Sequence, residues 1–311
     1  MFVPLLPVRV TVVIVGALLL AAGAAAAVRL RAPPRAVLAV VAIGVLLGGA
    51  GTAFGSSCDA ESAYFCARVE ADPERPSGRT LWLDDVQHSY VDLEDPRHLE
   101  FRYARWIAQV VERMEPGPLD AVFVGGGGFT LPRWLAAVRP GSRSRVLELD
   151  PELLALARTR LGLRTSDALT VRTGDARVTL RAEPRASADL VVGDAFGGRA
   201  VPWHLTTREF LRDVRRVLRP GGVYAMNLID RGALRLVRAE AATLLAVFPH
   251  VGVISSRDPG SGNHVLVASG RPLRLPDDPS LALRDPVAFA RDAGVLRDDH
   301  APADQLLAPR T

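Results

Sequence analysis

The chain reads LDAVFVGGGGFTLPRWLAAVRPGSRSRVLELDPELLALARTRL over residues 119–161, where short apolar runs alternate with segments of helical spacing. Residues 119–124 and 145–149 have the continuous apolar character of buried strands, and residues 131–138 and 151–161 have the spacing of helices. A glycine turn at residues 125–128 joins the first strand to the first helix. The stretch therefore predicts two successive β-α units of a parallel sheet.

The alternation continues toward the C-terminus. We expect further strands at residues 168–172, 190–193, 223–228, 251–255 and 264–268, and helices at 206–218 and 233–247. Thr206 and Glu209 have the spacing of a capping box, and the LRPGG sequence at 218–222 predicts a turn. Together these elements predict a Rossmann-like, doubly wound α/β sheet with its ligand at the carboxyl ends of the strands.

A smaller unit precedes this sheet. Residues 64–69, 79–83 and 86–91 are β-prone runs that predict a small antiparallel unit, and residues 100–114 have helical spacing. We therefore divide the chain into residues 1–57, residues 58–118, and residues 119–311, the last being a nucleoside-binding domain with a C-terminal tail.

Two apolar runs at the N-terminus predict a transmembrane helical hairpin. Residues 10–28 and 36–57 contain no charged residue, and each run is long enough to cross a bilayer. Gly44 and Gly48 offer a small-xxx-small face for packing the two helices. A secretory signal peptide ending in the alanine run at 24–27 is the alternative for the first helix.

The charges and cysteines beside the hairpin bear on its orientation. Arg29, Arg31 and Arg35 place the short loop in the cytoplasm by the positive-inside rule, which puts the folded domain outside. A bridge between Cys58 and Cys66 suits an oxidising compartment, and two free, buried cysteines are the alternative. Their spacing has no metal signature, so we expect no metal site.

The basic residues exclude several chemistries. All 38 of them are arginine, which rules out lysine-dependent phosphate loops, Schiff-base catalysis and lysine-tethered cofactors. The net charge is only +4 and the arginines are scattered among acids, so we expect no nucleic-acid partner.

Polar residues stand where the predicted parallel strands end. Main-chain N–H groups of the glycine turn can approach a ligand, and Thr130 breaks the dinucleotide pattern, which favours a nucleoside without a pyrophosphate. Glu148 ends the second strand, where a carboxylate accepts hydrogen bonds from ribose hydroxyls. Asp175 ends the third strand, where it would either bind the exocyclic amine of an adenine or cap a helix. Asp194 ends the fourth over the same crevice, with loop capping as its alternative.

Several motifs carry a family resemblance: VGGGG at 124–128, LELDP at 147–151, GDA at 174–176, VGD at 192–194, LRPGG at 218–222, LDDVQ at 83–87 and EFRY at 100–103. This succession resembles the spermidine synthase, or polyamine aminopropyltransferase, family within the class I methyltransferase fold. Residues 201–210 and 296–302 are similar to the membrane-attached bacterial branch of that family. The resemblance covers residues 79–302 and implies a role in polyamine biosynthesis.

The resemblance implies a set of site residues. Those expected to bind decarboxylated S-adenosylmethionine are Gln87, Gly125, Gly126, Gly127, Glu148, Asp175 and Ala176. Tyr103 would contact the acceptor, and Asp194 would be the catalytic carboxylate beside the attacking amine. No metal takes part.

The sequence also departs from the family pattern in the acceptor half of the site. Gly128 stands at the aspartate position of G-G-G-D-G, and Gly197 at the second aspartate of D-x-x-D. Ala104 and Arg105 replace the His-Glu pair that follows the tyrosine. Each lost acid removes a charge-assisted hydrogen bond of about 1.5–3 kcal/mol to a diamine.

The sequence thus predicts a membrane-anchored spermidine synthase-like transferase that moves an aminopropyl group to a small-molecule amine. The alternatives are an S-adenosylmethionine-dependent methyltransferase and a catalytically silent, membrane-anchored ligand-binding domain. We also expect contact with membrane lipid and a homodimer.

Overall fold

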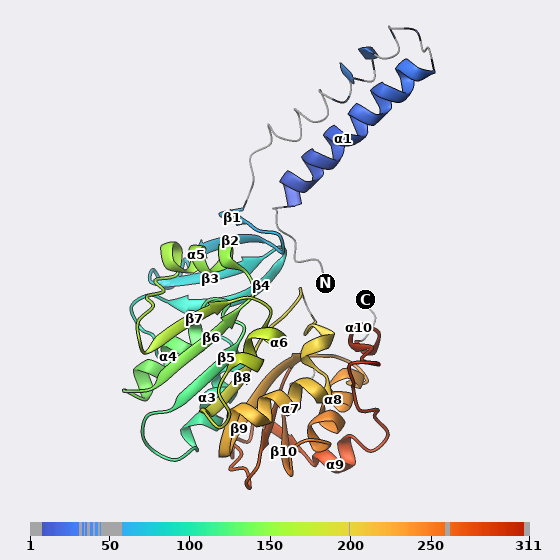
Figure 1. Ribbon diagram of the computed structural model, residues 1–311. Coiled ribbons are helices and arrows are strands. Elements are labelled where there is room, and N and C mark those ends of the chain that lie inside the picture. Colours follow the sequence, from blue (N-terminus) through green and yellow to red (C-terminus); the bar gives the residue numbers. More distant parts are fainter. Residues whose placement is uncertain are drawn as a thin grey trace. The chain divides into compact units, whose positions relative to one another are not determined.

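A computed structural model of the protein describes residues 8–30, 33, 35, 38–39, 41–42, 44, 58–198, 200–258 and 262–307 (Figure 1). The chain divides into two compact units, residues 1–68 and residues 69–311.

The first unit contains one long apolar helix, α1 (Val8–Arg29). Over Val10–Ala27 it is long and apolar enough to cross a membrane, a criterion that a signal sequence also meets. Most of the second predicted helix, residues 36–57, lies outside the described residues; within it, Gly44 lies against the Leu20 side chain, where a Cβ atom would clash. Beyond this segment, Cys58 and Cys66 form a disulfide with Cα atoms 5.3 Å apart. The bridge, and not the pair of free thiols, is therefore present.

The small antiparallel unit is confirmed. Its strands are β1 (Ala60–Glu61), β2 (Cys66–Ala71), β3 (Gly78–Leu83) and β4 (Val86–Asp92), in that spatial order. Asp84, with a φ of 53°, makes the tight turn between β3 and β4. Helix α3 (Arg102–Glu112) follows and buries an apolar face that includes Ile107 and Val111.

The predicted Rossmann-like sheet is also confirmed. Its spatial order is β12-β10-β11-β9-β8-β5-β6-β7. The strands are β5 (Asp120–Val124), β6 (Arg143–Glu148), β7 (Leu169–Thr173), β8 (Ala188–Gly193), β9 (Leu218–Ile229), β10 (His250–Ser256), β11 (Asn263–Ser269) and β12 (Leu281–Arg284). The strands from β9 to β7 pair in parallel, whereas β11, β10 and β12 pair antiparallel. The carboxyl ends of β5, β6, β7 and β8 therefore meet at one edge.

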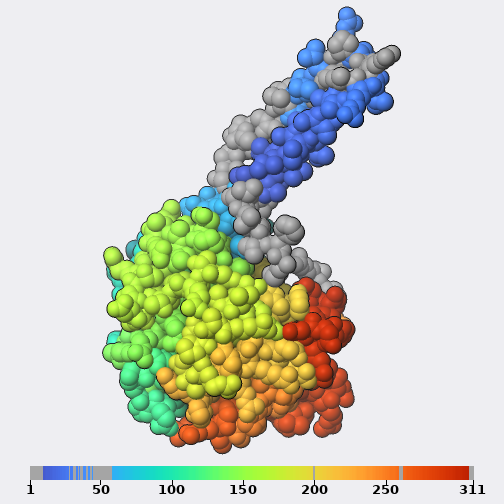
Figure 2. All heavy atoms as spheres, in the orientation of Figure 1, coloured from blue at the N-terminus to red at the C-terminus, as the bar shows by residue number. Residues whose placement is uncertain are grey.

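Helices cover the sheet. They are α4 (Thr130–Val138), α5 (Pro151–Arg160), α6 (Ala176–Thr179), α7 (Arg208–Val217), α8 (Arg235–Leu245), α9 (Pro286–Phe289) and α10 (Ala303–Leu306), with 3₁₀ turns at Leu180–Ala182 and Trp203–Leu205. Figure 1 shows α6, α7 and α8 on one face, where Phe210, Val214 and Leu236 pack into the main core. The C-terminal segment lies against the α8 side of the same unit (Figure 2). Asp298 fixes it by accepting hydrogen bonds from Arg177 and Thr207, both at 2.6 Å.

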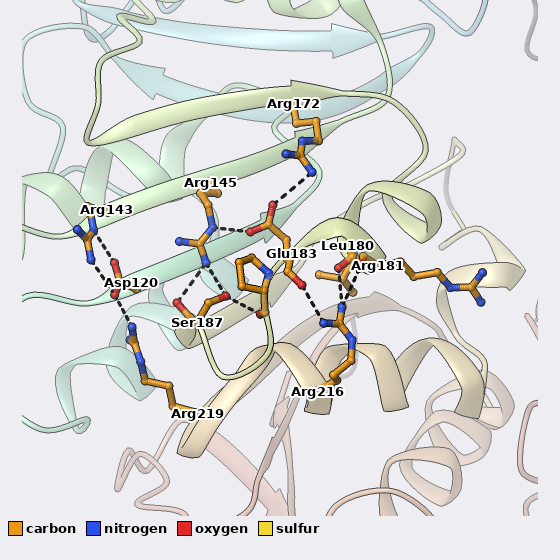
Figure 3. Close-up of polar contacts among 11 residues, drawn as sticks. Asp120, Arg143, Arg145, Arg172, Leu180, Arg181, Glu183, Ser187, Arg216 and Arg219 are labelled. Atoms are coloured by element: carbon orange, nitrogen blue, oxygen red, sulfur yellow. Dashed lines mark hydrogen bonds and ion pairs between the residues drawn. The ribbon is translucent and has the colours of Figure 1, made fainter.

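Arginine–carboxylate contacts tie the amino ends of the parallel strands together (Figure 3). Asp120 accepts from Arg143 and Arg219, each at 2.7 Å, and Arg219 also reaches Asp189 at 2.6 Å. Because β5, β6, β8 and β9 each supply one of these residues, the network fastens the edge opposite the predicted site.

Two local predictions need correction, and one strand was missed. The cap of α7 is Thr207, not Thr206, because Thr206 closes the preceding 3₁₀ turn by donating to the Trp203 carbonyl at 2.7 Å. The LRPGG segment is not a separate turn but a bulge inside β9, whose pairing partner shifts from Leu218 opposite Ala188 to Val223 opposite Leu190. Strand β12 was not predicted, since its pairing with β10 depends on a distant segment.

Candidate active site

The glycine turn and Glu148 face one another across two neighbouring strands. Val124 at the end of β5 lies opposite Leu147 of β6, so Glu148 comes beside the turn. Its Oε2 accepts from the Gly126 N–H at 2.7 Å and the Gly127 N–H at 3.4 Å, and its Oε1 accepts from the Asp150 N–H at 2.9 Å. A Cβ atom at Gly126 would lie 3.0 Å from that carboxylate. Glycine is therefore what allows the acid to lie under the turn.

The Glu148 carboxylate is 6% exposed. Burial raises its pKa, and the hydrogen bonds from Asp150 and the two glycines act in the opposite direction. A carboxylate has about four acceptor positions, so the three N–H groups leave capacity for a ligand hydroxyl. Asp150 caps α5 by accepting from the Glu152 N–H at 2.9 Å. The ribose-binding role of Glu148 stays a prediction.

Asp175 lies at the end of β7. Its Oδ1 caps α6 by accepting from the Arg177 N–H at 2.8 Å, and the same atom lies 3.4 Å from Nε2 of His204. Capping, which the sequence left open beside adenine binding, is thus present. Ala176 is buried next to it. Contact of either residue with an adenine stays a prediction.

Asp194 is held by side chains from two distant elements. It follows β8, and its main-chain N–H donates to the Val124 carbonyl at 2.9 Å. The Tyr103 hydroxyl of α3 donates to Oδ2 at 2.9 Å, and the Asn227 amide of β9 donates to Oδ1 at 3.0 Å. Burial raises the pKa of Asp194, while these two donors favour its charged form. The carboxylate is therefore oriented as well as partly buried.

Asn227 and Asn263 extend this arrangement, and the sequence analysis missed both. The Asn263 side-chain amide donates to Oδ1 of Asn227 at 3.1 Å, which leaves the Asn227 nitrogen directed at Asp194. The sequence contained one signal for Asn227, because this polar residue interrupts an apolar strand. In the structure Asn227 is 2% exposed. Asn263 had no such signal, since it approaches only through the antiparallel pairing of β11 with β9.

Two cavities bring the predicted residues together. A cavity of about 530 Å³ has Gln87, Tyr103, Asp194 and Asn227 in its wall. A small one of about 30 Å³ contains Tyr103 and Asp194 together with Gly125 and Gly126. The other predicted residues, Gly127, Glu148, Asp175 and Ala176, do not line either cavity, and Glu148 is connected to the smaller one through its hydrogen bond to Gly126.

The larger cavity is lined by charged residues of both signs. Its described lining residues include three arginines, Arg102, Arg105 and Arg231, and two acids, Asp194 and Glu100. Burial lowers the pKa of His88, also in the wall, to about 4, so this imidazole is neutral at neutral pH.

The structure explains one of the departures from the family pattern. A Cβ atom at Gly128 would lie 2.8 Å from Cβ of Ser89 and 2.9 Å from Cγ2 of Val91, so β4 excludes an aspartate there. The Gly128 N–H instead donates to the Ser89 hydroxyl at 3.0 Å. At Gly197 the nearest atom to such a Cβ, the Ala200 carbonyl oxygen, is 4.0 Å away, so a side chain has room.

Comparison with known proteins places this fold in the class I methyltransferase group. A family model described as "Methyltransferase domain" matches residues 122–226. The crystal structure of a probable spermidine synthase from Corynebacterium glutamicum is 30% identical, with a TM-score of 0.71, over 77% of this chain and 95% of that one. The protein belongs to the spermidine synthase (polyamine aminopropyltransferase) family.

Curated relatives match over a shorter stretch. The polyamine aminopropyltransferase of Vibrio vulnificus is 34% identical over 162 residues, which are 51% of this chain and 52% of that protein. The eEF1A lysine and N-terminal methyltransferase of Danio rerio is 31% identical over 160 residues, 48% of this chain and 23% of that protein. The match therefore spans about half the length of the bacterial relative.

Proposed function

We propose that this protein transfers an aminopropyl group from decarboxylated S-adenosylmethionine to an amine. Family membership supports the reaction class. The observation that carries the proposal is the position of Asp194, a partly buried carboxylate oriented by Tyr103 and Asn227 in the wall of a cavity beside the glycine turn.

The residues at the strand ends fit a nucleoside co-substrate. Gly127 has a φ of 50°, so the turn adopts a backbone that side-chain-bearing residues rarely take, and without Cβ atoms it lets a ligand approach the main chain. The N–H groups of residues 126–128 themselves donate to Glu148 and Ser89, so the turn acts by close approach and by holding Glu148. Glu148 retains acceptor capacity for a ribose hydroxyl beside that turn. When bound, the co-substrate supplies a sulfonium, a good leaving group, next to the carbon that the amine attacks.

Asp194 prepares the acceptor for this step. An alkylammonium has no lone pair, so a base must take its proton before the nitrogen can attack. Asp194 accepts that proton, and the hydrogen bonds from Tyr103 and Asn227 fix the carboxylate that positions the nitrogen for attack. The nitrogen lone pair forms the new C–N bond, and the C–S bond breaks with its electron pair moving to sulfur. The raised pKa of Asp194 makes it a stronger base than an exposed aspartate.

Methyl transfer from S-adenosylmethionine to an amine is the second candidate. The methyltransferase-domain match and the Danio rerio relative favour it. Both reactions use the same nucleoside half and the same base.

Co-substrate preference tests the proposal. The melting temperature of the full chain in detergent should rise with methylthioadenosine and rise more with decarboxylated S-adenosylmethionine than with S-adenosylmethionine. Mass spectrometry of amine products then distinguishes an added aminopropyl group from an added methyl group. Methylated product alone would replace the first candidate by the second.

We propose further that residues 10–57 anchor the protein in the membrane as two helices, with the catalytic unit outside the cytoplasm. The apolar α1, the three arginines at 29, 31 and 35, and the Cys58–Cys66 disulfide support this orientation. Reporter fusions after residues 32 and 311 should be cytoplasmic and periplasmic, respectively. A periplasmic reporter at residue 32 would overturn the orientation.

A further inference from the structure

The wall of the 530 Å³ cavity carries more positive than negative charge. Of its two carboxylates, Asp194 is the proposed base, and Glu100 lies 3.1 Å from Nε2 of His98. Of its three guanidinium groups, Arg102 is paired with Asp258 at 3.2 Å. Arg105 and Arg231 have no carboxylate within ion-pair distance among the described residues. Apart from the base, the described wall therefore carries two unpaired guanidinium groups against the single carboxylate of Glu100, and its net charge is positive.

Arg105 is fixed in this wall by the main chain. One of its nitrogens, Nη1, donates to the carbonyls of Leu99 at 2.8 Å and Glu100 at 2.7 Å. A guanidinium has five N–H donors, so this anchoring leaves others for a ligand. In the family pattern, the position of Arg105 is occupied by the glutamate of the His-Glu pair. The departure is thus a reversal of charge and not merely a lost acid.

Arg231 approaches the cavity from the end of β9. Its Nε would lie 2.9 Å from a Cβ atom at Gly262, so the guanidinium packs over that glycine. Arg231 and Asn227, which orients the base, line the same cavity. A ligand in this cavity can therefore meet Asp194 and a guanidinium at once.

We infer that the acceptor is an amine with a carboxylate at its other end, an ω-amino acid type of molecule, and not a diamine. This inference rests on the proposed function for the role of Asp194. The amine end lies at Asp194, and the carboxylate end lies at Arg105 and Arg231, where guanidinium groups form charge-assisted and bidentate hydrogen bonds with carboxylates. The second ammonium of a diamine meets the same guanidinium groups and is repelled.

Three acceptors of similar length and different end charge test the inference. Calorimetric titration of the full chain in detergent, saturated with methylthioadenosine, compares 4-aminobutyrate, butylamine and putrescine. We expect affinity to fall in that order, with 4-aminobutyrate at least about tenfold tighter than butylamine. Arg231→Gln and Arg105→Gln should each weaken 4-aminobutyrate by about tenfold while changing butylamine little. Arg274→Gln, an exposed arginine outside this cavity, is the matched control and should change neither.

The binding assay distinguishes a failure of the proposed reaction from a failure of the inferred ligand class. Tight 4-aminobutyrate binding that Arg231→Gln weakens as expected, without any aminopropyl or methyl product, would refute the proposed reaction and leave the ligand class standing. Equal or tighter binding of putrescine would overturn the inference even if the protein transfers aminopropyl groups. Absence of binding by all three compounds would overturn it too.

Discussion

The two halves of the site are built in different ways. The nucleoside half consists of main-chain N–H groups from one glycine turn and the acid of the next strand, Glu148, joined by hydrogen bonds of 2.7–3.4 Å. The acceptor half consists of side chains from four elements: Tyr103 on α3, Asp194 after β8, Asn227 on β9 and Asn263 on β11. Backbone geometry constrains the first half, whereas the second can change one side chain at a time.

The charges follow the same division. The buried acid of the nucleoside half is the family's own, while the acceptor half has lost acids at 128 and 197 and gained Arg105. If the proposed function holds, the protein keeps the family's co-substrate and changes its acceptor, because the two ligands are recognised by different kinds of group. The following predictions test this division.

Asp194→Asn should have the largest effect. The variant keeps the shape of the side chain but cannot take a proton from the amine, so turnover should fall by about 10² to 10⁴. Affinity for methylthioadenosine should not change, because that ligand is held by the other half. Steady-state kinetics and calorimetry measure the two quantities, with Asp189→Asn at the opposite edge of the sheet as control. Wild-type turnover in Asp194→Asn would refute its role as base.

Glu148→Gln tests the nucleoside half. Loss of the charge, with an amide now facing main-chain N–H groups, should weaken methylthioadenosine by about 1–3 kcal/mol, or roughly 5- to 150-fold. Amine binding to the free protein should change little. Calorimetry measures both affinities, and thermal melting checks that the variant is folded. A proportional loss of both affinities would show that the halves are not independent.

The family's aspartate can be restored at one of two glycine positions, Gly197, but not at the other, Gly128. Gly197→Asp combined with Arg105→Glu should increase the affinity for putrescine by about tenfold, because residue 197 has room for a side chain and the charge reversal at 105 is undone.

Gly128→Asp should instead lower the free energy of unfolding by about 1–3 kcal/mol, because its Cβ would clash with Ser89. Calorimetry and denaturant unfolding measure these effects. A stable Gly128→Asp variant would show that β4 does not exclude the family's aspartate.

Tyr103→Phe should give the smallest effect, a shift in pH dependence. The hydroxyl favours the charged form of Asp194, so its removal raises the pKa of that carboxyl further. Activity requires the deprotonated base and is lost as pH falls through its pKa. The acid limb of the profile of kcat/KM should therefore move to higher pH. An unshifted limb with lower kcat would mean that Tyr103 positions the amine without tuning the base.

The position of the strand-end residues could be predicted from the sequence because they belong to short motifs. The glycine turn and Asp194 follow apolar strands and Glu148 ends one, and parallel strands bring their carboxyl ends to one edge. Thr207 as the cap of α7 was missed by one residue, because the 3₁₀ turn that occupies Thr206 leaves no clear local pattern.

What the sequence by itself determined is the alternation of strands and helices, the apolar N-terminal helix and the residues at the strand ends, since each depends on periodicity or on neighbours in the chain. Only the tertiary structure decided how Asp194 is held and what charge surrounds it. Tyr103 and Asn227 lie 91 and 33 residues from Asp194 along the chain. Arg231, which follows β9, lines the same cavity as Asp194. The electrostatics of a cavity depend on distances in space, and the pattern along a strand does not contain them.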